Sequence, residues 1–325
     1  MIPLVQRYGD RLPLTEASPV VTLGEGSTPL LRAKRLGERA GCELWLKWEG
    51  ANPTGSFKDR GMTVAVSKAL EEGARAVVCA STGNTAASAA AYAARAGLAC
   101  LILQPAGAVA LGKVAQARAA GARVLAVRGS FDQALDAARE LAARETHVLV
   151  NSLNPHRLEG QKTAAFELLE ELGGPPDVLA LPYGGGGNTC AYAKGFAEAG
   201  EGTPRLVAGE AAVRADTLAT AIRIPEPVHR ADAEVAVAES GGAIVSLTDA
   251  EIVAAWRDLA RQEGVFCEPS SAAGLAAVLK EPSRGERVVC VVTGHGLKDP
   301  ESVDRHADAP VEVDPDADAI AEAAT

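Results

Sequence analysis

Residues 77–103 are VVCASTGNTAASAAAYAARAGLACLIL, one complete strand–helix–strand unit. Val77–Cys79 is typical of a buried strand, the Ala-rich stretch 84–96 of a helix, and 98–103 of a second strand. Two strands joined by a helix of this length lie parallel in one sheet. The stretch therefore predicts an α/β fold built on a parallel sheet.

The same alternation continues on both sides of this unit and falls into two series. Because 325 residues is long for one compact core, two series predict two α/β lobes with a cleft between them. The acidic end, 311–325, is compatible with a last strand and helix or with a frayed terminus. The other expected strands are 43–48, 123–127, 147–150, 178–181, 205–207 and 287–292, and the other expected helices are 111–120, 131–144, 157–172 and one after Asn188.

Composition narrows the partners that this chain can have. A net charge of −10 disfavours general attraction to phosphate backbones, and aromatic residues at 4% offer no stacking platform for bases. We therefore expect no nucleic-acid partner. Any anionic ligand must be held by a local arrangement of donors.

The cysteines indicate neither a metal site nor a redox pair. No two are close enough in sequence for a zinc clamp or a CxxC motif, and several lie in apolar runs, where Cys is a small core residue. The start, MIPLVQRYGDRLPL, lacks the layout of a signal peptide, and no stretch is long and apolar enough to span a bilayer. We expect no metal, no membrane contact and a cytoplasmic location. The six cysteines are Cys42, Cys79, Cys100, Cys190, Cys267 and Cys290.

Ligands of such sheets bind at the carboxyl ends of strands, so functional residues are expected in the loops that follow the strands. Lys58, in the segment 55–61, opens a helix that we expect to continue to Leu70. A lysine there is commonly a solvated charge. The positive helix end is nevertheless unfavourable for a cation and lowers the amine pKa, as a lysine that attacks a carbonyl requires.

Two further loops offer donors to anions. Ser81–Thr85 is compatible with a simple helix cap, or with hydroxyl and amide donors for a carboxylate or phenolate. Residues 182–189, PYGGGGNT, place four glycines between a strand and a helix, where free backbone N–H groups form a phosphate cradle. The lysine of a P-loop is missing, so a monophosphate is the better interpretation.

The last strand ends in the loop 292–300, VTGHGLKDP. The Thr293 hydroxyl comes directly after the strand, where it can face a ligand in the cleft. His295 is a candidate acid–base group, but the glycines on both sides of it favour a turn position.

Together these loops resemble the fold-type-II pyridoxal-5′-phosphate (PLP) enzymes, and the likeness to the threonine synthases is close. It runs from LGEGSTPL at 23–30 to TGHGLKDP at 293–300. Its most specific part is NSLNPHRLEGQKT, 151–163, which is similar to the segment that receives the substrate's phosphate. FCEPSS, 266–271, is similar as well but less diagnostic.

The resemblance implies a fold and a set of cofactor contacts. The fold has a large PLP-binding domain, 1–56 with 150–325, a smaller mobile domain, 57–149, and the active site in the cleft between them. Lys58, next to Phe57, binds the cofactor covalently and then carries protons. Asn84 bonds the phenolic oxygen, and Thr293 meets the pyridine nitrogen. The phosphate is held by Gly184, Gly185, Gly186, Gly187 and Asn188.

The resemblance also implies the substrate contacts and shows two departures. The family's glycine loop often has Asn where this chain has Gly185. In the separate segment 105–113 the family usually has a Lys where this chain has Ala108, which would leave more of the phosphate attraction to Lys113 and Arg157. The implied substrate-binding residues are Ser81, Thr82, Thr85, Asn151, Ser152, Arg157 and Asn188.

The implied activity is a lyase reaction of threonine biosynthesis, the conversion of O-phospho-L-homoserine and water to L-threonine and phosphate by γ-elimination and β-addition. The alternatives are a threonine or serine dehydratase on the same fold, which does not need the 151–163 segment, and a non-catalytic PLP-fold sensor, which intact Lys58, Asn84 and Thr293 disfavour. The family implies a homodimer. No regulatory extension is present, so no regulation is expected.

Overall fold

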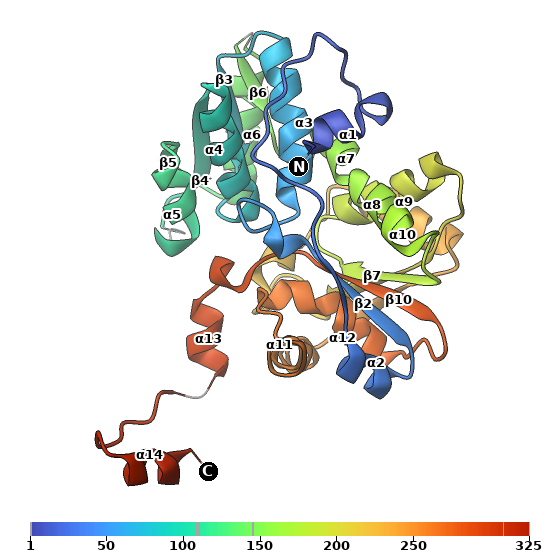
Figure 1. Cartoon of the computed structure of the whole chain (residues 1–325). Helices are drawn as coiled ribbons and strands as arrows, with labels where there is room; N and C mark the ends of the chain where they lie inside the picture. Colours follow the sequence, from blue (N-terminus) through green and yellow to red (C-terminus); the bar gives the residue numbers. More distant parts are fainter. Residues whose placement is uncertain (1, 108–110, 145, 308, 325) are drawn as a thin grey trace.

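Two separate β-sheets organise the molecule (Figure 1). The computed structural model describes residues 2–107, 111–144, 146–307 and 309–324. One sheet has six strands in the order β1-β2-β10-β7-β8-β9, and the other has four in the order β5-β4-β3-β6. All paired strands are parallel except β1 and β2. The predicted α/β fold with two parallel sheets flanked by helices is confirmed.

Strand β10 shows why the six-stranded sheet is covered on both faces. Its side chains alternate between two clusters: Val288, Cys290 and Val292 pack with helices α2, α11 and α12, while Val289 and Val291 pack with α8, α9 and α10. A strand buried on both faces is apolar throughout, as this one is in the sequence. The strands of this sheet are β1 (Leu30–Arg32), β2 (Glu43–Trp48), β7 (Val178–Pro182), β8 (Arg205–Ala211), β9 (Ala243–Leu247) and β10 (Arg287–Val292).

The four-stranded sheet is also covered on two faces. Val77 and Cys79 of β3 pack with helices α3 and α4, whereas Val78 and Ala80 pack with α6. Small alanines let α4 approach the sheet closely, as the Ala-rich sequence indicates. The elements of this part are α3 (Lys58–Glu71), β3 (Ala76–Ala80), α4 (Asn84–Ala96), β4 (Ala99–Pro105), α5 (Leu111–Ala119), β5 (Arg123–Val127), α6 (Phe131–Ala142) and β6 (His147–Leu149).

The remaining helices flank the six-stranded sheet or lie at the chain ends. Figure 1 shows the last of them, α14, standing apart from the body of the molecule, so the acidic end forms a helix there. They are α1 (Leu4–Arg7), α2 (Lys34–Ala40), α7 (Pro155–Gln161), α8 (Thr163–Leu172), α9 (Gly187–Ala199), α10 (Arg230–Glu239), α11 (Asp249–Glu263), α12 (Ala273–Lys280), α13 (Glu301–His306) and α14 (Ala317–Ala323), with short 3₁₀ turns at Gly9–Arg11, Glu49–Ala51, Thr220–Ile222, Pro269–Ala272 and Gly296–Lys298.

The helix expected at 157–172 differs in the structure. It begins earlier, at Pro155, because Asn154 caps it by accepting a hydrogen bond from the His156 N–H at 2.9 Å. It is divided at Lys162 into α7 and α8, and there the Thr163 hydroxyl donates to the Gly160 carbonyl at 2.7 Å. A Thr hydroxyl that bonds the preceding turn competes with the helical ladder and bends it.

Candidate active site

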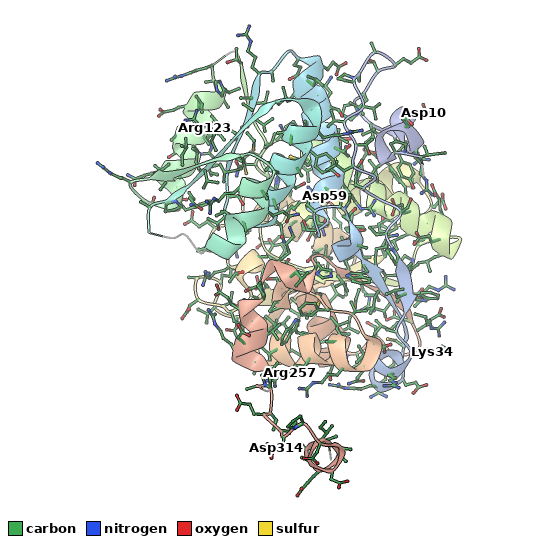
Figure 2. The ribbon with its side chains drawn as sticks, turned by 60° about the vertical axis from the view of Figure 1, so that its left-hand side comes forward. Asp10, Lys34, Asp59, Arg123, Arg257 and Asp314 are labelled. Atoms are coloured by element: carbon green, nitrogen blue, oxygen red, sulfur yellow. The ribbon has the colours of Figure 1, made fainter. Side chains whose placement is uncertain are left out.

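A cavity between the two sheets brings together loops that are far apart in the sequence. Its wall includes Phe57, Asn84, the glycine loop with Asn188, and Thr293, which are the predicted cofactor residues other than Lys58 itself. Figure 2 labels Asp59, next to Lys58, in the middle of the molecule, with Asp10, Arg123 and Arg257 at its periphery. The start of α3 therefore lies at the centre of the structure.

Lys58 is the first residue of α3 and is partly buried. Its Nζ lies 4.4 Å from the centre of the Phe57 ring and makes no hydrogen bond or ion pair with the described residues. Burial lowers the pKa of this amine to about 7, and Arg157 adds to the lowering, against the opposing influence of Glu268 and Cys79. A substantial fraction of the amine is therefore neutral, and nucleophilic, near neutral pH.

The glycine loop has the backbone shape of an anion cradle. Gly186 has φ +82° and precedes the first turn of α9, which begins at Gly187. A Cβ on Gly186 would lie 2.7 Å from the His229 carbonyl oxygen, so both the conformation and the space require glycine. A Cβ on Gly185 would make only an ordinary contact of 3.6 Å with Ile224, so a side chain fits there, as in the family pattern.

Two buried polar atoms beside this loop have no hydrogen-bond partner in the part of the chain that the structure describes: Asn188 Nδ2 and Thr189 Oγ1. Buried donors are nearly always satisfied, so a ligand oxygen is the natural acceptor for them. Together with the backbone N–H groups at the start of α9, these donors fit the phosphate of PLP.

Thr293 ends β10 at the opposite side of the cavity. Its hydroxyl lies 2.9 Å from Ser271 Oγ, which also accepts the Gly294 N–H at 2.8 Å. The Thr293 carbonyl accepts the Phe57 N–H at 3.0 Å, which ties this strand end to the residue before Lys58.

Asn84 donates from Nδ2 to Glu268 Oε1 at 2.9 Å. Glu268 is 4% exposed, and burial raises the pKa of its carboxyl to about 7, although the Asn84 hydrogen bond opposes the rise. Glu268 is not among the site residues predicted from the sequence, although it lies in the stretch 266–271 that resembles the family. The signal that could have found it is an acidic residue set among small and apolar neighbours, in Cys267-Glu268-Pro269.

The predicted substrate loop, Ser81–Thr85, precedes α4. The Ser81 hydroxyl accepts the Gly83 N–H at 3.2 Å, and Gly83, the residue at the helix cap, provides no side-chain cap. The hydroxyls of Thr82 and Thr85, both half-buried, make no hydrogen bond with the described residues. These hydroxyls and the first N–H groups of α4 are thus free to bind an anion.

The three residues taken from the 151–163 segment differ in how they are engaged. The Asn151 amide is held by the backbone of Ala80: Oδ1 accepts the Ala80 N–H at 2.9 Å, and one N–H of Nδ2 donates to the Ala80 carbonyl at 2.8 Å. Ser152 is half-buried, and its carbonyl lies 2.9 Å from His229 Nε2. Its hydroxyl has no partner among the described residues.

Arg157 is 1% exposed and forms no ion pair with a carboxylate of residues 2–107, 111–144, 146–307 or 309–324. Its Nη1 donates to the Val150 carbonyl at 2.9 Å, while Nε has no acceptor. Burial lowers the pKa of the guanidinium to about 10, against the opposing influence of Cys79 and Asp59. A buried cation of this kind calls for an anion, and a bound phosphate would supply it.

His295 does not lie within a turn, although its flanking glycines favour one: its backbone is extended, forms an isolated β-bridge with Cys267 and caps the 3₁₀ helix Gly296–Lys298. Its Nδ1 accepts the Leu297 N–H at 3.2 Å, and its ring stacks on Trp48 with the centroids 6.2 Å apart. Ala108 lies outside the described residues, as does the Lys113 side chain. No metal-binding cluster of His, Cys, Asp or Glu occurs in the described part of the chain, and none of its helices is long and apolar enough to cross a membrane.

Known proteins resemble this chain at two levels. Residues 21–294 match the family model described as pyridoxal-phosphate dependent enzyme. The chain is 52% identical over 317 residues to a threonine synthase of Halalkalibacterium halodurans, covering 91% of this chain and 90% of that protein. It is 50% identical to a threonine synthase of Mycobacterium tuberculosis, covering 96% and 93%. In fold, it is similar to the processed form of threonine deaminase isoform 2 from Solanum lycopersicum, with a TM-score of 0.76, 23% identity, and coverage of 94% and 88%.

Proposed function

The chain belongs to the family of pyridoxal-phosphate-dependent enzymes and, within it, to the threonine synthases, and from this premise we propose how its residues divide the work. Its function is that of a PLP-dependent lyase of threonine biosynthesis. The reaction is the conversion of O-phospho-L-homoserine and water to L-threonine and inorganic phosphate. Identity near 50% over more than nine-tenths of the chain supports this assignment over a dehydratase, whose likeness in the solved structures is one of fold.

The cofactor-binding residues are Lys58, Phe57, Asn84, Gly184–Asn188 and Thr293. Lys58 is the covalent anchor, because its lowered pKa provides the neutral amine that attacks an aldehyde. The N–H groups of the glycine loop, with Asn188 Nδ2, hold the phosphate. Asn84 faces the phenolic oxygen, and the Thr293 hydroxyl faces the ring nitrogen.

Bound PLP supplies an electron sink that acidifies the substrate carbons next to it. Lys58 then acts as the general base and acid: once the substrate amine has displaced it, the free amine takes and returns protons at the substrate carbons. A lysine with a pKa near the working pH suits both directions of proton transfer.

The substrate's phosphate is bound by Arg157 and Ser152, and its carboxylate by Ser81, Thr82 and Thr85. The single observation that carries this proposal is the buried Arg157 guanidinium, which has no anionic partner and a free Nε. Asn151 is fixed by its two bonds to Ala80, which leave one N–H of its amide for a ligand. We therefore propose that it braces the strand end that carries Ser152. In this assignment Asn188 contributes both to binding the cofactor's phosphate and to binding the substrate's phosphate.

The test is to incubate the purified, PLP-loaded protein with O-phospho-L-homoserine and to quantify phosphate and threonine together. Equal release of the two products is expected. If neither forms and the protein instead releases 2-oxobutanoate from threonine, the chain is a dehydratase and the Arg157 assignment is wrong. A coloured protein that turns over no amino acid would be a PLP-binding sensor.

We also propose that the protein works in the cytoplasm as a homodimer. The resemblance to the family supports both. Light scattering on the PLP-loaded protein is expected to give twice the mass of the 33.3 kDa chain, and the chain mass alone would contradict the dimer.

A further inference from the structure

Glu268 is a buried carboxyl in the wall of the cofactor cavity, and the proposed chemistry gives it no part. We propose that it is a positioning residue for Asn84: by accepting one N–H of the Asn84 amide, it aims the other at the phenolic oxygen of the cofactor. The inference rests on the proposed function in one respect, namely that Asn84 faces PLP.

The chemistry of the two side chains makes the orientation one-sided. An amide can present either its NH₂ or its oxygen to a neighbour, and the two orientations have nearly the same shape. With a pKa of about 7, the Glu268 carboxyl is ionised at and above neutral pH, and in that form it only accepts hydrogen bonds, so it selects the orientation with Nδ2 toward Glu268. The second N–H of the same nitrogen remains available to donate to a phenolate. Without the carboxylate, the amide is free to turn its oxygen toward the phenolate, which repels it.

Glu268 is itself held in place by its backbone. Its N–H donates to the Gly294 carbonyl at 3.1 Å, and its carbonyl accepts the Ser271 N–H at 2.9 Å. A Cβ on Gly294 would lie 2.5 Å from Glu268 Oε1, so the carboxyl occupies the space that this glycine leaves open. The carboxyl therefore has little freedom to move away from Asn84.

The carboxyl has no ion-pair partner among the described residues, although Lys58 and Lys298 act on it at longer range. An unpaired buried carboxyl costs stability that an apolar side chain of similar volume would not. A group of that kind in a ligand cavity indicates a functional demand. Asn84 begins α4 on the four-stranded sheet, while Glu268 lies beside the end of β10, so the bond also joins the two sides of the cavity.

A double-mutant cycle tests the proposal with cofactor affinity as the readout. The variants are Glu268→Met, Glu268→Gln, Asn84→Ala and the double variant Glu268→Met/Asn84→Ala. Met conserves the volume and removes the acceptor, whereas Gln conserves the acceptor and removes the charge. Each apo-protein is titrated with PLP, the visible absorption maximum of the loaded protein is recorded, and thermal denaturation checks folding.

Loss of one hydrogen bond predicts that Glu268→Met weakens PLP binding by roughly 3- to 10-fold and shifts the absorption maximum in the direction that Asn84→Ala shifts it. Glu268→Gln restores part of the affinity, because its amide can accept from Asn84 in one orientation but donates to it in the other, and the double variant binds no more weakly than Asn84→Ala alone. Factors that multiply in the double variant would overturn the proposal, as would a Gln variant no better than Met. The cycle needs no substrate, so it can fail while the wild-type protein still releases phosphate and threonine equally, or succeed if that release fails.

Discussion

Lys58 and Arg157 are two cations placed close enough that the guanidinium lowers the pKa of the amine. Like charges are kept together in a protein interior only at a cost in stability. Neither side chain forms an ion pair with a described residue, so no carboxylate among those residues neutralises the two cations. A phosphorylated ligand beside both would offset that cost, which links the electrostatics of the apo-site to the chemistry proposed for it.

The rate of covalent PLP capture should follow the titration of Lys58. Only the neutral amine attacks an aldehyde, and its pKa is lowered, so the neutral form exists well below the ordinary lysine range. The capture rate is expected to rise about tenfold per pH unit below a midpoint near pH 7 and to level off above it. Stopped-flow absorbance of apo-protein mixed with PLP measures it.

Lys58→Ala is the matched control for this titration. It should bind PLP without covalent capture, so that its affinity across the same pH range reports how the phosphate contacts alone depend on pH. It should also lack turnover, and an active Lys58→Ala variant would remove the lysine from the chemistry. A capture rate that keeps rising to pH 10 would mean that Lys58 titrates as an ordinary surface lysine.

Arg157→Leu is expected to leave the PLP dissociation constant nearly unchanged and to raise KM for O-phospho-L-homoserine by on the order of 100-fold, the loss of two charge-assisted hydrogen bonds. Arg157→Lys should recover part of that loss, because it keeps the charge but not the bidentate geometry. Steady-state kinetics with both variants measure the effect. An unchanged KM in Arg157→Leu would place the substrate's phosphate elsewhere.

At the scale of single residues, the sequence predicts those site residues whose role shows in the neighbouring residues of the chain. Lys58 at a helix start and the glycines at a strand–helix junction are readable from neighbours in the chain. The bond between Asn84 and Glu268 joins positions 184 residues apart, and no local pattern encodes it. The engagement of Asn151 with Ala80 is hidden for the same reason, at a separation of 71 residues.

The crossing of α3 and α7 is the contact between elements that sets Lys58 against Arg157. A Cβ on Gly160 of α7 would lie 1.9 Å from the Arg60 carbonyl oxygen, and one on Gly61 of α3 would lie 2.6 Å from the Arg157 carbonyl oxygen. The two backbones touch at this crossing, so neither helix can approach further or tolerate a side chain there.

Gly160→Ala should therefore separate the two helices. The expected results are a lower melting temperature, weaker PLP binding and a higher KM for the substrate. Overpacking of this kind costs about 1–3 kcal/mol. Differential scanning calorimetry and a PLP titration measure the two effects. Gly9→Ala is the control, because a Cβ on Gly9 has no atom within 4 Å and φ there is not positive; equal effects of both substitutions would refute the crossing argument.

Several elements begin and end where the sequence predicted. The expected bounds of 43–48, 84–96, 123–127 and 287–292 are those of β2, α4, β5 and β10. Strand β1, antiparallel at the sheet edge, is three residues long, which is too short to show a pattern. Strand β9 was not predicted either, although it is no more exposed than β5, which was. The domain boundaries at 57 and 149 stay a prediction. All strands of the four-stranded sheet lie within 57–149, and all strands of the six-stranded sheet lie outside that range.

On the scale of the whole molecule, Arg60 fastens α3 to the six-stranded part of the structure. It is 1% exposed and forms two hydrogen bonds of 2.7 Å to each of Glu49, which follows β2, and Glu167 of α8. Lys47 of β2 lies 3.1 Å from Glu167, which brings a second cation to the cluster. Since Lys58 begins the helix that Arg60 anchors, this ionic cluster determines where the catalytic amine lies relative to the glycine loop.

Arg60→Leu should destabilise the protein by about 3–5 kcal/mol, because it leaves two buried carboxylates without their main partner. On the order of 10 °C of melting temperature would be lost. Arg139→Leu is the matched control: its partner Asp136 and Arg139 itself are exposed, so the same substitution should change stability by less than about 0.5 kcal/mol. Thermal denaturation of both PLP-loaded variants at pH 7.5 compares them.

The pH dependence separates lost charge from lost packing. Burial acts to raise the pKa of Glu167, but Arg60 and Lys47 outweigh it and hold that pKa at about 2, below the usual 4.5. In the wild-type protein this depressed pKa contributes stability that is fully present above pH 4.5 and is lost as pH falls toward 2. In Arg60→Leu the carboxyl loses that support and takes up a proton more readily, so the deficit in melting temperature should shrink between pH 7.5 and 5. A deficit that stays constant over this range would mean that Arg60 acts through packing, and the ionic anchoring of α3 would be refuted.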